Sequence, residues 1–559
     1  MEENSKRKNS YSLTDVRALI LILSILLLPL CYLFLSMPVY VLVLVGLVGY
    51  KIYSWKYTNS KSKRDLSSTG EDMNVCIVGA GFSGLCMGIK LKEAGIPFKI
   101  IEKSSDVGGT WWDNRYPGCA CDVWSNVYQF SFFQNPNWSC LVVPADEISE
   151  YLRKTAKHYN LYDHISFNTS VERATWNEDD KCWKVFMDNQ DEAIIATHLV
   201  SACGVLRKPN LPDIPGIETF QGKSCHSQQM KADIDLYKGK RVAVVGSAAS
   251  AVQICPAIVD HVKELYVFQR TPNWIIPKWN PTIPNWFKLL LTKIPALAAI
   301  IRLFIFTMFE LIGMVVLNKG IVSDLYKKAL KRHYKNELVG NKDLLKKLTP
   351  NFGVGCKRVL LSNDFIPMFT TKSNANLITE QIKSIDKGGL NTKDGNHYDV
   401  DIIVYATGFS NEESICGFET VGRDQTTTLK AYFEKYPTAY LGITVPTFPN
   451  MFLMLGPNTV LAHNTVTFMM ECAADYVVDC IDQAIRSGIS SVDVHNKVTD
   501  EFRSEMNEAT LRKNFSGNCR TWYKNKDGIN FILWPSNLYH YWWITRKAEL
   551  LRDFKITFL

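Results

Sequence analysis

Residues 74–84 read NVCIVGAGFSG, and this stretch determines the fold of the first half of the chain. Its first five residues have the composition of a short buried strand, the next six contain three glycines, and residues 85–94 have a helical pattern. The next apolar run, residues 97–102, reads PFKIIE and ends at Glu102. Glycines in a strand–turn–helix unit let a pyrophosphate approach the helix N-terminus, where backbone N–H groups and the helix dipole attract negative charge. The sequence therefore predicts a dinucleotide-binding βαβ unit in which Glu102 accepts hydrogen bonds from ribose hydroxyls.

A second unit of the same kind begins at residues 240–245, KRVAVV, which lead into GSAASA at residues 246–251. The first glycine position is kept as Gly246, but Ala248 stands at the second, where its methyl group faces the approaching pyrophosphate. The following strand ends at Arg270, 24 residues after Gly246. An arginine in place of the usual acidic residue favours a ribose 2′-phosphate, hence NADPH over NADH, because a guanidinium pairs well with phosphate. The alternative is an ordinary surface arginine at a strand end. Two dinucleotide folds in one chain indicate a flavin and a nicotinamide that work together.

The overall composition indicates a globular protein of more than one domain. A length of 559 residues suggests two or three packed units, and 47% hydrophobic with 21% charged residues allows a large core. The net charge of +8 is spread along the chain without a basic stripe, so we expect no nucleic-acid partner. The 15 cysteines lack framework spacing and predict reduced, partly buried thiols in a reducing compartment. No cluster has metal-ligand spacing, and we expect no metal.

The N-terminal region contains a tract suited to a membrane. Residues 18–50 carry no charged side chain over 33 positions, whereas a span needs about 20 apolar residues. Pro29 and Pro38 interrupt the tract, so a kinked or tilted span and a hairpin that dips into the bilayer both fit. A polar linker comes next, which argues against a buried core helix. The basic residues on either side of the tract slightly favour a cytosolic location for the part of the chain that follows it. We expect the tract to anchor the protein in the endoplasmic reticulum membrane.

A second apolar stretch, residues 295–317, contains Arg302 and Glu310. Charges at the centre of a membrane span are costly, so the sequence favours an amphipathic or buried helix over a second crossing. Contact of this helix with a membrane surface stays open.

Residues 108–122 read GGTWWDNRYPGCACD. They match the long fingerprint of Baeyer–Villiger monooxygenases at every defined position: Gly-Gly-x-Trp, Tyr-Pro-Gly, and an aspartate four residues after that glycine. Residues 220–226 resemble the family's shorter fingerprint, although Met230 stands where a tryptophan is expected. Other segments similar to the family are residues 269–274, 356–358, 401–409, 456–459 and 521–523. The chain thus resembles class B flavoprotein monooxygenases, which include Baeyer–Villiger and flavin-containing monooxygenases, from about residue 72 to 547.

The resemblance implies a flavoprotein oxidoreductase that uses FAD, NADPH and O2 through a flavin C4a-peroxide and converts lipophilic ketones to esters or lactones. Such a peroxide must stay anionic to attack a carbonyl, and an arginine, which is always charged, can hold that anion. Arg358 is the candidate for this role, and Asp122 is the candidate for the carboxylate that orients it. Taken singly, Arg358 could form a surface salt bridge and Asp122 could cap a turn. Their joint presence in matched motifs favours the catalytic interpretation.

The matched motifs also imply the cofactor contacts. The residues expected to bind FAD are Gly79, Gly81, Phe82, Ser83, Gly84, Glu102, Gly109, Thr110, Trp111, Asp122, Tyr128 and Asn458. The residues expected to bind NADPH are Gly246, Ser247, Ala248, Ser250, Arg270, Thr271, Lys357 and Trp522. The resemblance further implies that His226 assists domain movement or nicotinamide handling, although a lone histidine is more often structural.

The expected fold class is α/β, with two Rossmann-like dinucleotide-binding domains, a helical insertion and an N-terminal membrane helix. The expected division is an N-terminal tail and anchor at residues 1–57, a linker at 58–71, FAD-binding parts at 72–212 and 399–559, NADPH-binding parts at 213–272 and 355–398, and the insertion at 273–354.

Two other functions remain open at this point. One is a flavin monooxygenase that oxygenates nitrogen or sulfur atoms, for which the oxidant is a hydroperoxide and no arginine is needed. The other, from a different class, is a flavin-binding membrane protein without oxygenase turnover. Ala248 and Met230 favour this alternative because they replace the glycine and the tryptophan that the two motifs usually contain. The apolar insertion and the anchor favour a lipophilic substrate.

Overall fold

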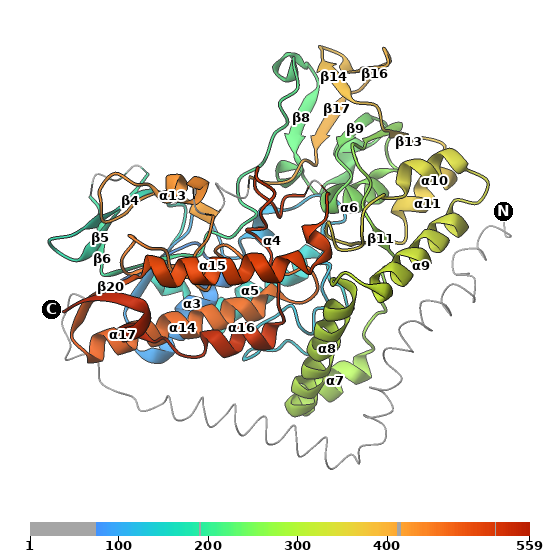
Figure 1. Cartoon of the computed structure of the whole chain (residues 1–559). Helices are drawn as coiled ribbons and strands as arrows, with labels where there is room; N and C mark the ends of the chain where they lie inside the picture. Colours follow the sequence, from blue (N-terminus) through green and yellow to red (C-terminus); the bar gives the residue numbers. More distant parts are fainter. Residues whose placement is uncertain are drawn as a thin grey trace.

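The computed structural model describes residues 74–188, 190, 192–410, 415–435, 437–519 and 521–558. The expected membrane anchor within residues 18–50 lies outside the described residues. Two parallel five-stranded sheets form the framework of the described chain; the second is at the upper right of Figure 1 and the first lies behind the helices at its centre. An α/β fold with parallel sheets is what the sequence predicts.

The first sheet has the strand order β19-β7-β1-β2-β3, and all neighbouring strands are parallel. Its strands are β1 (Val75–Val78), β2 (Phe98–Ile101), β3 (Ile165–Ser166), β7 (His198–Ser201) and β19 (Met451–Leu453). β1 is an unbroken buried run because both of its faces are covered, as in most parallel sheets. Helix α3 (Phe82–Ala94) follows β1 and packs against α14 (Val466–Arg486), which comes from the far end of the chain. The predicted strand–turn–helix–strand unit is present, with a helix that begins three residues earlier than expected.

The second sheet has the order β13-β10-β9-β17-β8, again with parallel neighbours. Its strands are β8 (Lys223–His226), β9 (Arg241–Val245), β10 (Glu264–Phe268), β13 (Ala375–Ile378) and β17 (Ile402–Tyr405). Helix α6 (Ala249–Ile258) follows β9 and packs against α11 (Phe365–Thr371). Because β17 lies between β9 and β8, this sheet extends past residue 399, where the sequence places the return to the first unit. The chain leaves the sheet after Tyr405.

Smaller elements surround the two sheets. The smaller sheets are formed by β4 (Val171–Asn177), β5 (Cys182–Met187), β6 (Ile194–Ala196) and β18 (Glu419–Val421); by β14 (Ile382–Ile385), β15 (Gly389–Thr392) and β16 (His397–Asp399); by β11 (Ile275–Ile276) and β12 (Leu360–Leu361); and by β20 (Ile489–Val494) and β21 (Phe554–Phe558). The other helices outside the insertion are α4 (Thr110–Asp113), α5 (Ala145–His158), α13 (Leu429–Lys435), α15 (Asn496–Leu511), α16 (Leu538–Thr545) and α17 (Leu550–Asp553).

The insertion expected at residues 273–354 is helical, and its helices run down the right side of Figure 1, from α10 in the upper part to α7 at the bottom. They are α7 (Asn285–Lys293), α8 (Pro295–Val316), α9 (Ile321–Glu337) and α10 (Lys342–Leu348). By length and composition α8 could cross a membrane, and within the described part of the chain it is the helix that meets this test.

The two charged residues of α8 are both buried against the body of the protein. Arg302 donates through Nη1 to the backbone carbonyls of Asn126, Val127 and Gln129, at 3.2, 2.9 and 3.1 Å. Glu310, 1% exposed, accepts a hydrogen bond from the Leu538 amide at 2.7 Å. A buried charge without its partners is strongly unfavourable, so these contacts hold one face of α8 on the body. α8 is thus packed on the body with its two charged residues and exposes apolar side chains elsewhere.

Candidate active site

The turn after β1 leaves no room for side chains. Gly79 has φ +109°, and a Cβ there would lie 2.7 Å from the Ala202 carbonyl oxygen. A Cβ on Gly84 would lie 1.8 Å from the Gly79 oxygen. Gly81 provides no side-chain cap to α3, so the first N–H groups of this helix remain available. The turn therefore forms a cradle that fits a pyrophosphate at a helix N-terminus.

Glu102, which follows β2, is held beside this cradle. Its carboxylate accepts hydrogen bonds from the amides of Ala80 at 2.6 Å and Ser104 at 2.8 Å. The residue is only 4% exposed. Each carboxylate oxygen has a second lone pair, so Glu102 can still accept hydrogen bonds from the hydroxyls of a bound ribose.

An aromatic cluster adjoins the same turn. The Trp111 indole donates to the Tyr128 hydroxyl at 3.1 Å, and the Tyr128 and Phe82 ring centroids are 5.2 Å apart. Gly109, with φ +54°, lies so close to Gly81 that a Cβ on it would be 3.0 Å from the Gly81 Cα. The motif at residues 108–122 is thereby folded against the turn at residues 79–84, as a shared flavin site requires. Thr110 is the first residue of α4, and Ser83 lies in the first turn of α3.

Asn458 lies on the loop that follows β19, a strand of the same sheet. Its Nδ2 group donates to the carbonyls of Asn530 at 3.3 Å and Leu533 at 3.1 Å. The amide donor is thus engaged with the C-terminal segment, and Asn458 fixes that segment to the edge of the first sheet.

The turn after β9 forms a second cradle. Gly246 has φ +119°, and a Cβ there would lie 2.3 Å from the Ala406 carbonyl oxygen. Ser247 is buried, and its carbonyl accepts a hydrogen bond from Asn273 Nδ2 at 2.9 Å. Ala248 provides no side-chain cap to α6, whose first turn contains Ser250, so N–H groups again remain available. Ala248 itself is exposed, and its methyl group replaces the hydrogen of the usual glycine at the surface of the turn.

Two cations meet beside the second cradle. Lys357 donates from Nζ to the Thr271 hydroxyl at 2.9 Å. Burial lowers the pKa of the Lys357 ammonium group, and the positive charge of Arg270 lowers it further. Among the described residues neither cation forms an ion pair. Two like charges held together without a carboxylate fit a phosphate group, which is the role expected for Arg270, Thr271 and Lys357.

Asp122 and Arg358 form an ion pair through two hydrogen bonds. Arg358 Nε donates to Asp122 Oδ2 at 2.6 Å, and Nη2 donates to Oδ1 at 2.5 Å. Burial pushes the pKa of the Asp122 carboxyl upward, but the Arg358 guanidinium outweighs it and holds that pKa below its ordinary value. Asp122 in turn raises the pKa of Arg358. The remaining Nη1 group lies 3.4 Å from the Leu461 carbonyl oxygen.

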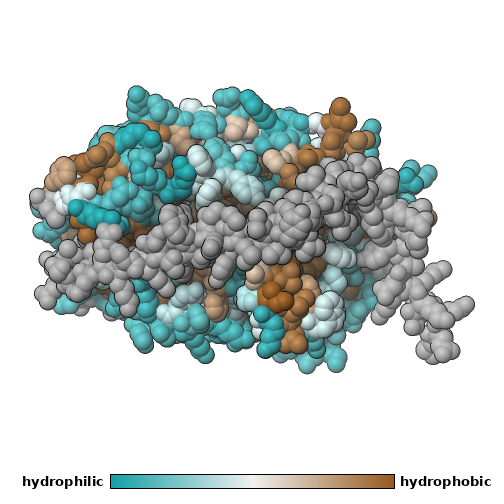
Figure 2. All heavy atoms as spheres, turned by 90° about the horizontal axis from the view of Figure 1, so that it is seen from below, coloured by the Kyte–Doolittle hydropathy of each residue, from teal (hydrophilic) through white to brown (hydrophobic). Residues whose placement is uncertain are grey.

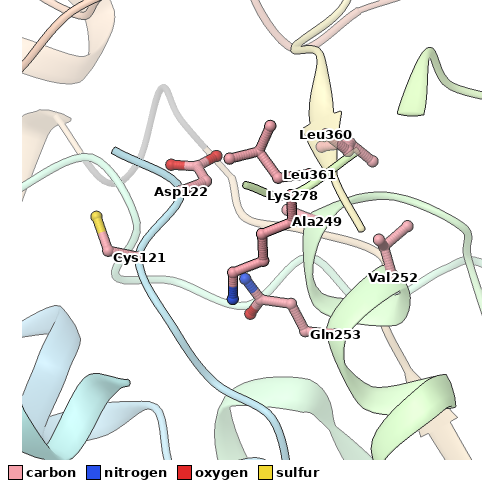
Figure 3. Close-up of a pocket in the computed structure, with 8 residues that line it drawn as sticks. All are labelled: Cys121, Asp122, Ala249, Val252, Gln253, Lys278, Leu360 and Leu361. Carbon is pink, nitrogen blue, oxygen red and sulfur yellow. The ribbon is translucent and has the colours of Figure 1, made fainter. Parts of the chain in front are cut away.

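Asp122 also lines a pocket between its own segment, helix α6 and strand β12. The pocket has about 330 Å³ of empty space, part of it open to solvent. It is lined by Cys121, Asp122, Ala249, Val252, Gln253, Lys278, Leu360 and Leu361. In Figure 3 the Asp122 carboxylate and the Lys278 ammonium group enter this pocket from different sides. The segment of residues 108–122 from the first unit and helix α6 of the second unit thus line the same pocket.

A disulfide joins the Arg358 segment to the C-terminal part of the chain. Cys356 is bonded to Cys519, across 163 residues of sequence. The expectation that all cysteines are reduced is therefore wrong for this pair, because no local spacing reports a contact between such distant residues. The other cysteines of the described chain are present as thiols, outside any disulfide. The bond holds Lys357 and Arg358 near the segment that contains Trp522.

Tyr523 belongs to the segment at residues 521–523 that resembles the family, but the sequence assigns no role to its side chain. Its side chain is buried, and the hydroxyl has no hydrogen-bond partner within the described residues. Its electrostatic influence on Arg358 places it near the ion pair. The half-buried Trp522 ring is 4.8 Å from the Tyr523 ring. A buried hydroxyl without a partner fits a site that is completed by a bound ligand.

His226 makes structural contacts at the end of β8. Its Nδ1 accepts from the Gln228 amide at 3.2 Å, and its Nε2 lies 2.9 Å from the Gly408 carbonyl oxygen. Burial lowers the pKa of His226 and so favours its neutral form. Met230, in the position expected for tryptophan, is 2% exposed and packs in the core of the second unit.

The cation pair predicts the discrimination between NADP⁺ and NAD⁺. In Lys357→Ala, the affinity for NADP⁺ is expected to fall by roughly 10- to 100-fold, since a charged hydrogen bond to the 2′-phosphate is lost. The affinity for NAD⁺ is expected to change little. Calorimetric titration of the full chain measures both, with the exposed Lys346→Ala as control. Equal losses for both nucleotides would contradict the assignment.

The chain was compared with protein families, curated proteins and solved structures. Residues 72–438 match the family described as flavin-binding monooxygenase-like. A Baeyer–Villiger monooxygenase of Pseudomonas aeruginosa is 36% identical over 480 residues, which are 85% of this chain and 90% of that protein. A Baeyer–Villiger monooxygenase of Streptomyces coelicolor is 33% identical, over 86% of this chain and 92% of that protein.

Solved structures give the same answer. The structure of OTEMO in complex with FAD and NADP has a TM-score of 0.78 and 25% identity, and covers 88% of this chain and 100% of its own. An oxidized steroid monooxygenase bound to NADP has a TM-score of 0.77 and 26% identity, with 87% and 99% covered. With a family match over most of its length and these relatives, the chain belongs to the flavin-binding monooxygenase-like family.

Proposed function

We propose that the protein is an NADPH-dependent FAD monooxygenase that performs Baeyer–Villiger oxidation of lipophilic ketones. The overall reaction is ketone + O2 + NADPH + H⁺ → ester or lactone + H2O + NADP⁺. The observation that carries the proposal is the ion pair of Arg358 with Asp122, which also lines the pocket beside helix α6. The relatives named Baeyer–Villiger monooxygenase and the FAD and NADP complexes of OTEMO support it.

The residues of this chain fit both cofactors. The cradle at residues 79–84, Glu102 and the aromatic cluster would hold FAD, and the cradle at residues 246–251 with the cation pair would hold NADPH. When bound, the flavin takes up hydride from NADPH and activates O2, chemistry that side chains cannot supply.

Arg358 supplies a fixed positive charge for the oxygenation step. Its Nε and Nη2 groups are occupied by Asp122, which fixes the plane of the guanidinium and leaves Nη1 as the group with the longest and weakest contact. A preorganised cation stabilises negative charge that develops on oxygen during attack on a ketone. Oxygenation of a nitrogen or sulfur atom does not require this charge, and for this reason the geometry favours the ketone reaction.

We propose the division of domains given by the sequence, with one adjustment. The FAD-binding parts include the first sheet, and the NADPH-binding parts include the second. Since β17 belongs to the second sheet, we extend the NADPH-binding unit through Tyr405. The helices of residues 273–354 form the insertion.

Loss of the Arg358 charge is expected to remove ester formation selectively. In Arg358→Ala, the rate of ester formation falls by at least about 100-fold, as for other lost oxyanion partners, while NADPH consumption continues with release of hydrogen peroxide. Product analysis with a lipophilic ketone measures ester formation, and the absorbance of NADPH measures its consumption. Bound FAD reports folding, and Arg512→Ala, an exposed arginine, is the control. Ester formation at the normal rate in Arg358→Ala, or no ester from any ketone with the unaltered protein, would refute the proposal.

We also propose that residues 18–50 anchor the protein in the endoplasmic reticulum membrane with its body in the cytosol. The length of this uncharged tract supports the anchor. After expression in eukaryotic cells, the chain is expected to stay in the membrane pellet during alkaline carbonate extraction, and protease added to intact microsomes is expected to digest the body. Release into the carbonate supernatant contradicts the anchor, and protection from protease contradicts the orientation.

A further inference from the structure

The helical insertion and α16 expose a group of large apolar side chains. On α7, on α8 and at the residue between them these are Trp286, Leu289, Ile294, Leu303 and Met314. We call this set the α7–α8 face. α7 and the lower end of α8 lie at the bottom of Figure 1, and the view from below shows hydrophobic surface on that side of the molecule (Figure 2).

The α7–α8 face continues onto α16. The Tyr539 hydroxyl is 2.7 Å from the Thr307 hydroxyl of α8, and the Tyr539 and Phe306 rings are 5.6 Å apart. Trp542 and Trp543, three and four residues further along α16, are 42% and 55% exposed. Residues spaced three and four apart share one side of a helix, so the tryptophans extend the exposed surface that Tyr539 joins to α8.

We propose that the α7–α8 face and α16 lie on the surface of a phospholipid bilayer, without crossing it. Arg302 and Glu310 fix α8 to the body, so the helix cannot leave the body to span a membrane without exposing two charges to lipid. What remains outward is an apolar side with tryptophan and tyrosine, the residues that are enriched at membrane–water interfaces.

The charge of this region favours an anionic lipid surface as the partner. Glu310 is the only carboxylate between residues 271 and 323, and it is buried. Lys293 and Lys319 are exposed, and Lys288 is half-buried. Cations close to an apolar surface attract anionic headgroups. A second copy of the chain that docked through the same face would bring these cations together, which disfavours a symmetric dimer.

Helix α8 packs against the segment of residues 461–464, which lies beside Arg358. On the body side of α8, Gly313 packs so closely on His463 that a Cβ would lie 2.3 Å from its ring. The neighbouring Asn464 donates to Glu310 at 2.7 Å. Leu461, two residues before His463, provides the carbonyl near Arg358. The helix that would rest on the bilayer is therefore packed directly against the segment that borders the proposed site for lipophilic substrates.

Photo-crosslinking of the full chain in lipid nanodiscs tests the proposal. p-Benzoylphenylalanine replaces Leu303 in one protein and Ile195 of β6 in the control, since both residues are about half exposed, at 51% and 53%. In discs that contain phosphatidylserine, the label at position 303 is expected to give at least about fivefold more phospholipid adduct than the label at 195, as judged by mass spectrometry. Both proteins must retain bound FAD.

Each other outcome overturns the proposal in a defined way. Equal adduct yields at the two positions would show that the face does not rest on lipid. Crosslinks to residues 18–50 of the same chain would identify the N-terminal tract as the occupant, and crosslinked dimers would identify a second copy. A further comparison isolates the charge: Lys288→Glu/Lys293→Glu is expected to lower the adduct yield at position 303 at least about threefold. An unchanged yield of phospholipid adduct in this double variant would contradict the role of Lys288 and Lys293. None of these readouts depends on catalytic turnover.

Discussion

Asp122 and Arg358 are 236 residues apart in the chain and meet through two hydrogen bonds. Asp122 ends the motif that folds against the turn of the first sheet. Arg358 lies two residues before β12, whose partner β11 follows strand β10 of the second sheet. The two side chains are partly buried, 29% and 22% exposed, and removal of one would leave the other charge without its partner. The pair therefore fixes how the two nucleotide-binding units face each other, and at the same point it places a permanent positive charge. One contact thus contributes both to the geometry of the site and to its chemistry.

Three consecutive residues, 356–358, each make a contact on which the site depends. Cys356 is bonded to Cys519, Lys357 contributes to the cation pair, and Arg358 binds Asp122. A displacement of this short segment would disturb the phosphate contact, the ion pair and the position of the loop with Trp522 together. The site thus depends on long-range contacts between segments that are each simple in themselves: two tight turns, one motif and one tripeptide.

Local patterns predicted the parts of this structure that local forces determine. The unit of β1, α3 and β2 follows from an apolar run, a glycine turn and a helical period within 29 residues, at 74–102. The packing of α8 on the body followed from two charges in an apolar stretch. The strand order that places β17 between β9 and β8 could not be predicted, because pairing of distant strands leaves no periodic signal. The same holds for the disulfide between Cys356 and Cys519, and the partnerless hydroxyl of Tyr523 is visible only once the surrounding chain has folded. The candidates Arg358 and Asp122 came from a family resemblance, and the structure brings them together.

The central claim is that Asp122 directs Arg358 toward oxidation of ketones. A substrate that contains both a ketone and a thioether tests it most directly, through the ratio of ester to sulfoxide formed by the unaltered protein and by Asp122→Asn. This substitution keeps the size of the side chain but removes the charge that orients Arg358, while sulfoxidation needs neither. The account predicts that the unaltered protein forms mainly ester and that the ratio falls at least about tenfold in Asp122→Asn, with FAD still bound. An unchanged ratio would contradict the account, since the ion pair would then have no part in the choice of reaction.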